Sequence, residues 1–134
     1  MRLDTEANKC FVCGPGNQRG LNIRFSLRDD TCTAEWTSVP EFMGYDGVTH
    51  GGILFCLLDD VMANLLFLKG EVCVTARADV RFRNPLGIGE VVDLESRLQT
   101  RRGRLAVIEG KIVTRNNPTV IAESTGTFMV QSSS

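Results

Sequence analysis

Hydrophobic and polar residues alternate along most of this chain, which is the pattern of half-buried β-strands. The alternation is most regular from Val74 to Phe82, and it ends at a turn that contains Pro85. Similar alternation covers residues 22–28, 32–37, 92–98, 105–114 and 120–130. The pattern therefore predicts six strands, followed by a frayed polar end over residues 131–134.

One segment, residues 51–68, does not alternate. It reads GGILFCLLDDVMANLLFL, is rich in leucine, and is followed by a lysine and a glycine that are typical of a helix end. Its apolar residues cover nearly the whole circumference of a helix, so most sides must be buried. Two strands, one helix and four strands in this order predict an α+β fold in which an antiparallel sheet curls around the helix.

Length and charge narrow the class of protein. The 134 residues are enough for one domain, which we place at residues 22–131 behind an N-terminal arm and Cys/Gly-rich turn at residues 1–21. A net charge of −1 excludes a nucleic-acid binder that works through bulk charge. Since no apolar run reaches the ~18 residues of a membrane span and the first residues lack a signal-peptide layout, we expect a cytoplasmic protein without a membrane partner.

The five cysteines fit a reducing compartment, because their number is odd and no secretion signal is present. Cys10 and Cys13 form the one Cys-x-x-Cys pair, within a run of turns rich in glycine and proline. A structural zinc site needs four ligands, and no second Cys-x-x-Cys or Cys/His pair accompanies this one. The sequence therefore predicts a strained turn with two small residues rather than a metal site.

The start of the predicted helix has the most specific motif. Residues 47–52 read GVTHGG, and Asp59 follows His50 by nine residues. Over about residues 42–130 this arrangement resembles the hotdog-fold acyl-CoA thioesterases, above all their phenylacetyl-CoA-type group. The opening CFVCG at residues 10–14 also resembles a leader of bacterial members. The resemblance implies a hotdog fold, an acyl-CoA substrate, no cofactor, and a homodimer or homotetramer.

Gly51 and Gly52 open the helix at its positively polarised end, where unpaired N–H groups attract anions. A glycine there lets a substrate carbonyl approach the backbone closely. The resemblance implies that the N–H of Gly51 stabilises the oxyanion, and we place Gly52 among the substrate-binding residues. The alternative is that both glycines only permit close helix packing.

Asp59 and Asp60 are two adjacent carboxylates in an apolar helix, where burial without partners is costly. They project ~100° apart, so they cannot both face the same surroundings. The resemblance implies that Asp59 is the general base or nucleophile, and we place Asp60 beside the substrate. The alternative is that both face a solvent channel or a subunit seam.

His50 and Thr75 complete the catalytic candidates. His50 is the only histidine, and we favour a supporting role over proton transfer. The resemblance implies that Thr75 orients the attacking water, although threonine is also common in strands for its β propensity. Some family members have an asparagine six residues before the histidine; here Gly44 occupies that position, so the task is omitted or falls to Tyr45 or Asp46.

Arg102, Gly103 and Arg104 lie in the densest basic cluster of the chain, at a predicted hairpin turn. Guanidinium groups and open backbone N–H groups suit the phosphates of coenzyme A, and the resemblance points to the same hairpin. Arg83 is the candidate for a second contact. The alternative is a basic turn that is only solvated.

These residues predict an acyl-CoA thioesterase in which Gly51 of one subunit meets Asp59 of the other, as the resemblance implies. Two other functions remain open. A hotdog hydratase or dehydratase is one, because a fold does not determine the reaction. A non-catalytic sensor of acyl ligands is the other, acting through a partner.

Overall fold

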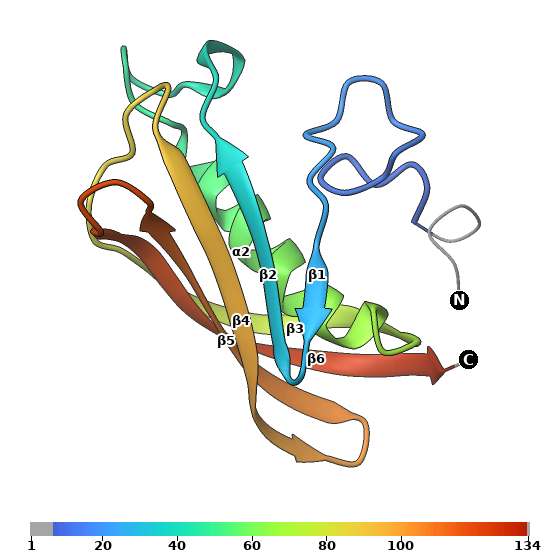
Figure 1. Cartoon of the computed structure of the whole chain (residues 1–134). Helices are drawn as coiled ribbons and strands as arrows, with labels where there is room; N and C mark the ends of the chain where they lie inside the picture. Colours follow the sequence, from blue (N-terminus) through green and yellow to red (C-terminus); the bar gives the residue numbers. More distant parts are fainter. Residues whose placement is uncertain (1–6, 134) are drawn as a thin grey trace.

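The computed structural model describes residues 7–133, and its order of elements confirms the predicted order of two strands, one helix and four strands (Figure 1). The elements are β1 (Ser26–Arg28), β2 (Thr31–Thr37), the short 3-10 helix η1 (Pro40–Phe42), α2 (Gly51–Phe67), β3 (Glu71–Phe82), β4 (Val91–Arg102), β5 (Leu105–Thr114) and β6 (Val120–Ser133). None of the described helices has the length and apolar character that crossing a membrane requires.

The six strands form one antiparallel sheet in the order β1-β2-β4-β5-β6-β3. The sheet curves around α2, and the β4–β5 hairpin extends beyond it (Figure 1). Gly103 closes that hairpin with a φ of 57°, a left-handed conformation that favours glycine. Because β3 is the last strand in the order, it forms an edge of the sheet.

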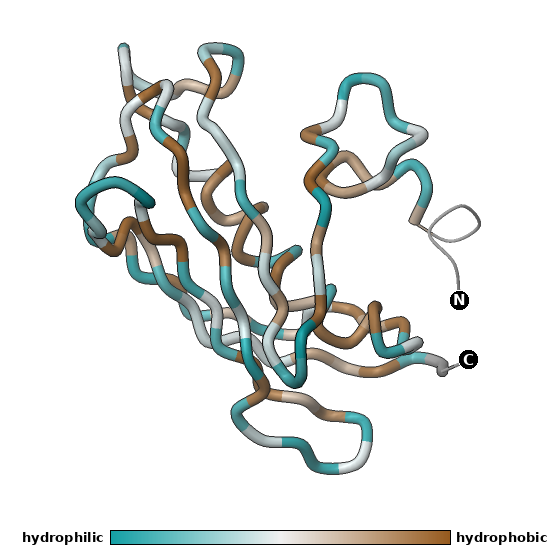
Figure 2. The backbone as a smooth tube through the Cα atoms, in the orientation of Figure 1, coloured by the Kyte–Doolittle hydropathy of each residue, from teal (hydrophilic) through white to brown (hydrophobic). Residues whose placement is uncertain are grey.

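The core lies between α2 and the inner face of the sheet. Figure 2 shows hydrophobic residues along α2 and alternating hydropathy along β4. Leu57, Leu58, Val61 and Met62 are fully buried, which confirms a helix enclosed on most sides. A Cβ at Gly110 of β5 would lie 2.9 Å from Cγ of Met62, so this glycine lets the helix approach the sheet.

The first predicted strand is shorter than expected. Residues 22–25 are not in a strand, because Asn22 has a positive φ of 52° and the N–H of Ile23 donates to the carbonyl of Val12 at 2.9 Å. This bond ties residues 22–25 to the N-terminal turn, where Val12 is buried. The alternating pattern was therefore correct about which side chains face inward, but wrong about the backbone pairing.

The C-terminal strand is longer than expected. Residues 131–133 continue β6 and pair with the start of β3, where Glu71 lies opposite Ser133, so the predicted fraying from residue 131 is wrong. Residues 1–6 of the predicted N-terminal arm lie outside the described residues, as does residue 134. The predicted boundary at residue 22 stays a prediction.

Candidate active site

The first turn of α2 is held by its capping histidine. His50 is the N-cap, and its Nδ1 accepts a hydrogen bond from the N–H of Gly52 at 2.8 Å. The N–H of His50 donates to the carbonyl of Phe42 at 2.9 Å, and that of Thr49 donates to Leu86 at 2.8 Å. The loop before the helix is therefore anchored to two other segments, and the supporting role of His50 stays a prediction.

The N–H of Gly51 has no hydrogen-bond acceptor within residues 7–133. Since His50 occupies the N–H of Gly52, Gly51 presents the open donor at this end of α2. A Cβ at Gly51 would lie 3.8 Å from Cε1 of Phe82, so an aromatic ring borders the donor. Phe82 was not among the candidates, because an alternating strand pattern does not show which residue ends beside a helix terminus.

Asp59 and Thr75 are hydrogen-bonded. The hydroxyl of Thr75 in β3 donates to Oδ1 of Asp59 in α2 at 2.6 Å. The pairing of β3 with β6 shifts register between Thr75 and Arg77, and such a β-bulge redirects nearby side chains. No residue in the range 7–133 donates to Oδ2 of Asp59. One carboxylate oxygen is therefore fixed by Thr75, and the other is open to water or substrate.

Asp60 faces a different part of the molecule. Its Oδ2 lies 3.7 Å from Sγ of Cys10 and 3.4 Å from Nδ2 of Asn64, and Asn64 also donates to the Asp60 carbonyl at 2.9 Å. Burial raises the pKa of Asp60, and hydrogen bonds from Cys13 and Cys10 oppose that rise. The carboxylate of Asp60 therefore lies against the N-terminal turn, whereas the carboxylate of Asp59 bonds to Thr75.

The remaining thiols are packing residues. Burial raises the pKa of Cys32 to about 12 and that of Cys73 to about 11, and it also raises the pKa of Cys56. All three therefore stay protonated near neutral pH, which makes them poor nucleophiles.

The three predicted phosphate-binding arginines differ in their interactions with other residues. The side chains of Arg102 and Arg104 are exposed, and no ion pair or hydrogen bond joins them to another residue in the range 7–133. Arg83 instead donates from Nε to Oε1 of Glu123 at 2.9 Å. Arg102 and Arg104 can therefore bind an anion with all their donors, whereas Nε and Nη2 of Arg83 already bond to Glu123.

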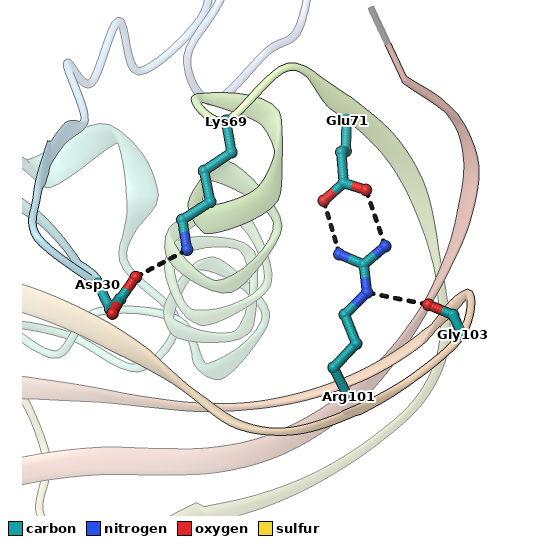
Figure 3. Close-up of polar contacts among 5 residues, drawn as sticks. All are labelled: Asp30, Lys69, Glu71, Arg101 and Gly103. Carbon is teal, nitrogen blue, oxygen red and sulfur yellow. Dashed lines mark hydrogen bonds and ion pairs between the residues drawn. The ribbon is translucent and has the colours of Figure 1, made fainter.

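Arg101 holds the hairpin in place. It donates to both carboxylate oxygens of Glu71 at 2.6 and 2.8 Å, and its Nε donates to the carbonyl of Gly103 at 2.9 Å (Figure 3). The guanidinium of Arg101 lowers the pKa of Glu71. These contacts fix the base of the turn that displays Arg102 and Arg104. Figure 3 also shows Lys69, just after α2, paired with Asp30 at 3.0 Å.

An open groove crosses the outer face of the sheet, away from α2. It is lined by alternating charges that include Arg81, Glu95, Lys111 and Glu123, and none of the predicted site residues lines it. The candidate active-site residues therefore lie at the start of α2 and at the Asp59–Thr75 pair, and not in this groove.

A family model described as the thioesterase superfamily matches residues 46–121, which contain His50, Gly51, Asp59 and Thr75. The chain belongs to the thioesterase superfamily. The predicted family is thereby confirmed.

Individual superfamily members show how far the likeness extends. The chain is 27% identical over 90 residues to acyl-coenzyme A thioesterase THEM5 of Mus musculus, covering 67% of this chain and 36% of that protein. It therefore spans little more than a third of that relative's length.

Two solved superfamily structures have the same fold. A hypothetical thioesterase from Streptococcus pneumoniae TIGR4, solved with coenzyme A, has a TM-score of 0.78 and 19% identity, covering 84% of this chain and 90% of that chain. The PaaI protein of E. coli, from the phenylacetic acid degradation operon, has a TM-score of 0.80 and 17% identity, covering 98% and 88%. The α+β hotdog fold is confirmed.

Proposed function

We propose that this chain hydrolyses acyl-CoA thioesters at the Asp59–Thr75 pair. The observation that carries the proposal is that Thr75 fixes Oδ1 of Asp59 while Oδ2 stays open. Membership of the thioesterase superfamily supports the reaction, and the names of relatives such as THEM5 support acyl-coenzyme A as the substrate class. The odd set of free cysteines supports a cytoplasmic location.

The reaction uses water and groups of the protein. Oδ2 of Asp59 takes a proton from water, and the resulting hydroxide attacks the thioester carbonyl. The carbonyl oxygen becomes an oxyanion, which accepts a hydrogen bond from the N–H of Gly51 at the positive end of α2. The intermediate then collapses: the C–S bond breaks, the coenzyme A thiolate takes the proton from Asp59, and the free acid leaves. If Asp59 instead attacks the carbonyl directly, the C–S bond breaks, coenzyme A leaves as a thiolate, and an acyl-aspartyl anhydride forms. Water then hydrolyses the anhydride to the free acid and the Asp59 carboxylate, and the proton that is released goes to the thiolate.

Variants of the streptococcal protein offer further support. Two of its structures were solved with an aspartate or a threonine replaced by alanine, at positions 16 residues apart. Asp59 and Thr75 are separated by the same 16 residues. The equal spacing supports a shared role for the pair.

The site is complete only when two copies meet. Gly51 and Asp59 lie eight residues apart on one helix, a rise of about 12 Å, whereas an oxyanion donor and a base must both lie close to one carbonyl. The donor of one copy therefore acts with the base of another. The edge strand β3, which contains Thr75, is the surface through which we expect a homodimer to form, alone or within a homotetramer.

Coenzyme A binds through its phosphates to Arg102 and Arg104 at the hairpin turn around Gly103. Arg83 follows the end of the 12-residue strand β3. Arg101 ties the hairpin to Glu71 at the start of the same strand, and the two ends of β3 are about 36 Å apart along the strand. The hairpin arginines and Arg83 of one chain therefore do not bind the same ligand, and Arg83 would contact the substrate held by the partner copy. The streptococcal structure solved with coenzyme A supports this ligand class.

The test is the release of free thiol from a panel of acyl-CoA substrates, with enoyl-CoA hydration measured in parallel. The proposal expects thiol release with at least one acyl group and no hydration. Hydration without thiol release would assign the chain to the hydratases, and tight acyl-CoA binding without either reaction would make it a sensor.

A further inference from the structure

The Cys-x-x-Cys turn meets a carboxylate from the middle of α2. The ligand atoms of Cys10, Cys13 and Asp60 all lie within 4.8 Å of one another, and the three residues are half-buried. Sγ of Cys10 is 3.7 Å from Oδ2 of Asp60, although the two residues are 50 positions apart in the chain. Asp60 was not predicted as a ligand, because only cysteine and histidine were considered as partners of Cys10 and Cys13.

The backbone holds the two thiols on one side of a tight turn. The N–H of Cys10 donates to the carbonyl of Ala7 at 3.1 Å, and the N–H of Gly14 donates to the carbonyl of Cys10 at 2.8 Å. A Cβ at Gly14 would lie 2.4 Å from the backbone nitrogen of Cys10, so only glycine fits. Buried Val12 anchors the turn in the core. The ligand geometry is therefore set by the fold before any ion binds.

The separation between Cys10 and Asp60 matches one edge of a small tetrahedral site. With Zn–S bonds of about 2.3 Å and Zn–O bonds of about 2.0–2.2 Å, tetrahedral angles place a sulfur and an oxygen ligand about 3.5 Å apart. The observed 3.7 Å between Cys10 and Asp60 is close to this edge. Buried Asn64 donates to Oδ2 of Asp60 at 3.4 Å, as residues around a metal site orient its ligands.

We infer that Cys10, Cys13 and Asp60 bind one Zn²⁺ ion, with water in the fourth position. Zn²⁺ binds both thiolates and carboxylates, and the two thiolates favour it over Mg²⁺ and Ca²⁺, which prefer oxygen ligands. The ion joins the N-terminal turn to α2 one residue beyond Asp59. The carboxylate of Asp60 projects about 100° around the helix from that of Asp59. The ion therefore does not take part in the Asp59–Thr75 pair, and it goes beyond the proposed thioesterase function.

The test measures metal content in the reduced, full-length protein. The chain is stripped with a chelator, loaded with Zn²⁺ or Co²⁺, desalted, and analysed by mass spectrometry and absorbance. We expect about one ion per chain, with a thiolate-to-cobalt charge-transfer band and the visible bands of tetrahedral Co²⁺. Failure of the wild type to retain one ion, or a cobalt spectrum without the thiolate band, would overturn the site.

Variants locate the ion. Cys10→Ser, Cys13→Ser and Asp60→Asn should each weaken Zn²⁺ affinity by at least about 10- to 100-fold. Asp60→Cys should restore binding and strengthen the charge-transfer band, which shows that a weakened variant has lost a ligand and not its fold. The matched controls are Asp59→Asn, the neighbouring carboxylate, and Cys73→Ser, a packing thiol; equal loss of zinc in these controls would refute the assignment. Because zinc is measured without substrate, its result is independent of thiol release.

Discussion

Replacing Asp59 with asparagine should remove catalysis while preserving the fold. The amide has nearly the shape of the carboxylate, and its oxygen can still accept the hydrogen bond that Thr75 donates at 2.6 Å. It cannot take a proton from water. General base catalysis contributes about 100- to 10,000-fold, so we expect kcat to fall by that factor, which is about 2.7–5.4 kcal/mol in the barrier.

Asp60→Asn is the matched control, because it makes the same chemical change one residue further along α2. Asp60 faces Cys10 and Asn64 and is not bonded to Thr75, so we expect kcat to fall by less than about 10-fold. The assay records initial rates of thiol release over a range of acyl-CoA concentrations, with a blank that subtracts the protein thiols. Circular dichroism and thermal unfolding check that both variants fold. Equal losses in the two variants, or full activity in Asp59→Asn, would refute the assignment of Asp59.

Three further predictions follow from the same geometry. Thr75→Val removes a hydrogen bond to a charged group, which is worth about 1.5–3 kcal/mol, and at this exposed site we expect kcat to fall about 10-fold. Thr75→Ser keeps the hydroxyl and should retain activity. An unchanged kcat in Thr75→Val would contradict the role of Thr75. Arg102→Ala combined with Arg104→Ala should raise KM for acyl-CoA, more at low salt than at high, without changing KM for acyl-pantetheine. Equal effects on both substrates would show that Arg102 and Arg104 are structural. Arg101→Ala, which breaks the ion pair with Glu71, should instead lower Tm by a few degrees. Sedimentation at micromolar concentration should show a dimer or tetramer, and a monomer active at full rate would exclude a shared site.

The regular strands and the helix could be predicted because each has a strong local pattern. The helix predicted at residues 51–68 matches α2 at Gly51–Phe67, since its leucine-rich run cannot alternate. The strand predicted at residues 22–28 was too long, because alternation reports which side chains are buried and does not show where the backbone N–H groups donate. The bond from Ile23 to Val12 depends on a turn that no periodicity describes.

In the candidate site, too, local motifs could be predicted and contacts between distant residues could not. The motif around His50 and Asp59 is local, and the sequence was enough to name it. Whether an arginine is paired depends on residues far away in the sequence: the partner of Arg101 lies 30 residues away and that of Arg83 lies 40 residues away. The approach of Asp60 to Cys10 spans 50 residues and was missed for the same reason.

The glycine at position 44 and the capping histidine belong to one arrangement. A Cβ at Gly44 would lie 3.3 Å from Cα and 3.4 Å from Cδ2 of His50, closer than most side-chain contacts allow. A larger side chain at that position, such as the asparagine of the family pattern that the sequence resembles, would require His50 to shift by a few tenths of an ångström while Nδ1 accepts the N–H of Gly52. With glycine there, His50 keeps the second N–H of the helix occupied, so an incoming carbonyl meets the N–H of Gly51 as the open donor. In the proposed mechanism, the N–H of Gly51 therefore stays the open donor with glycine at position 44.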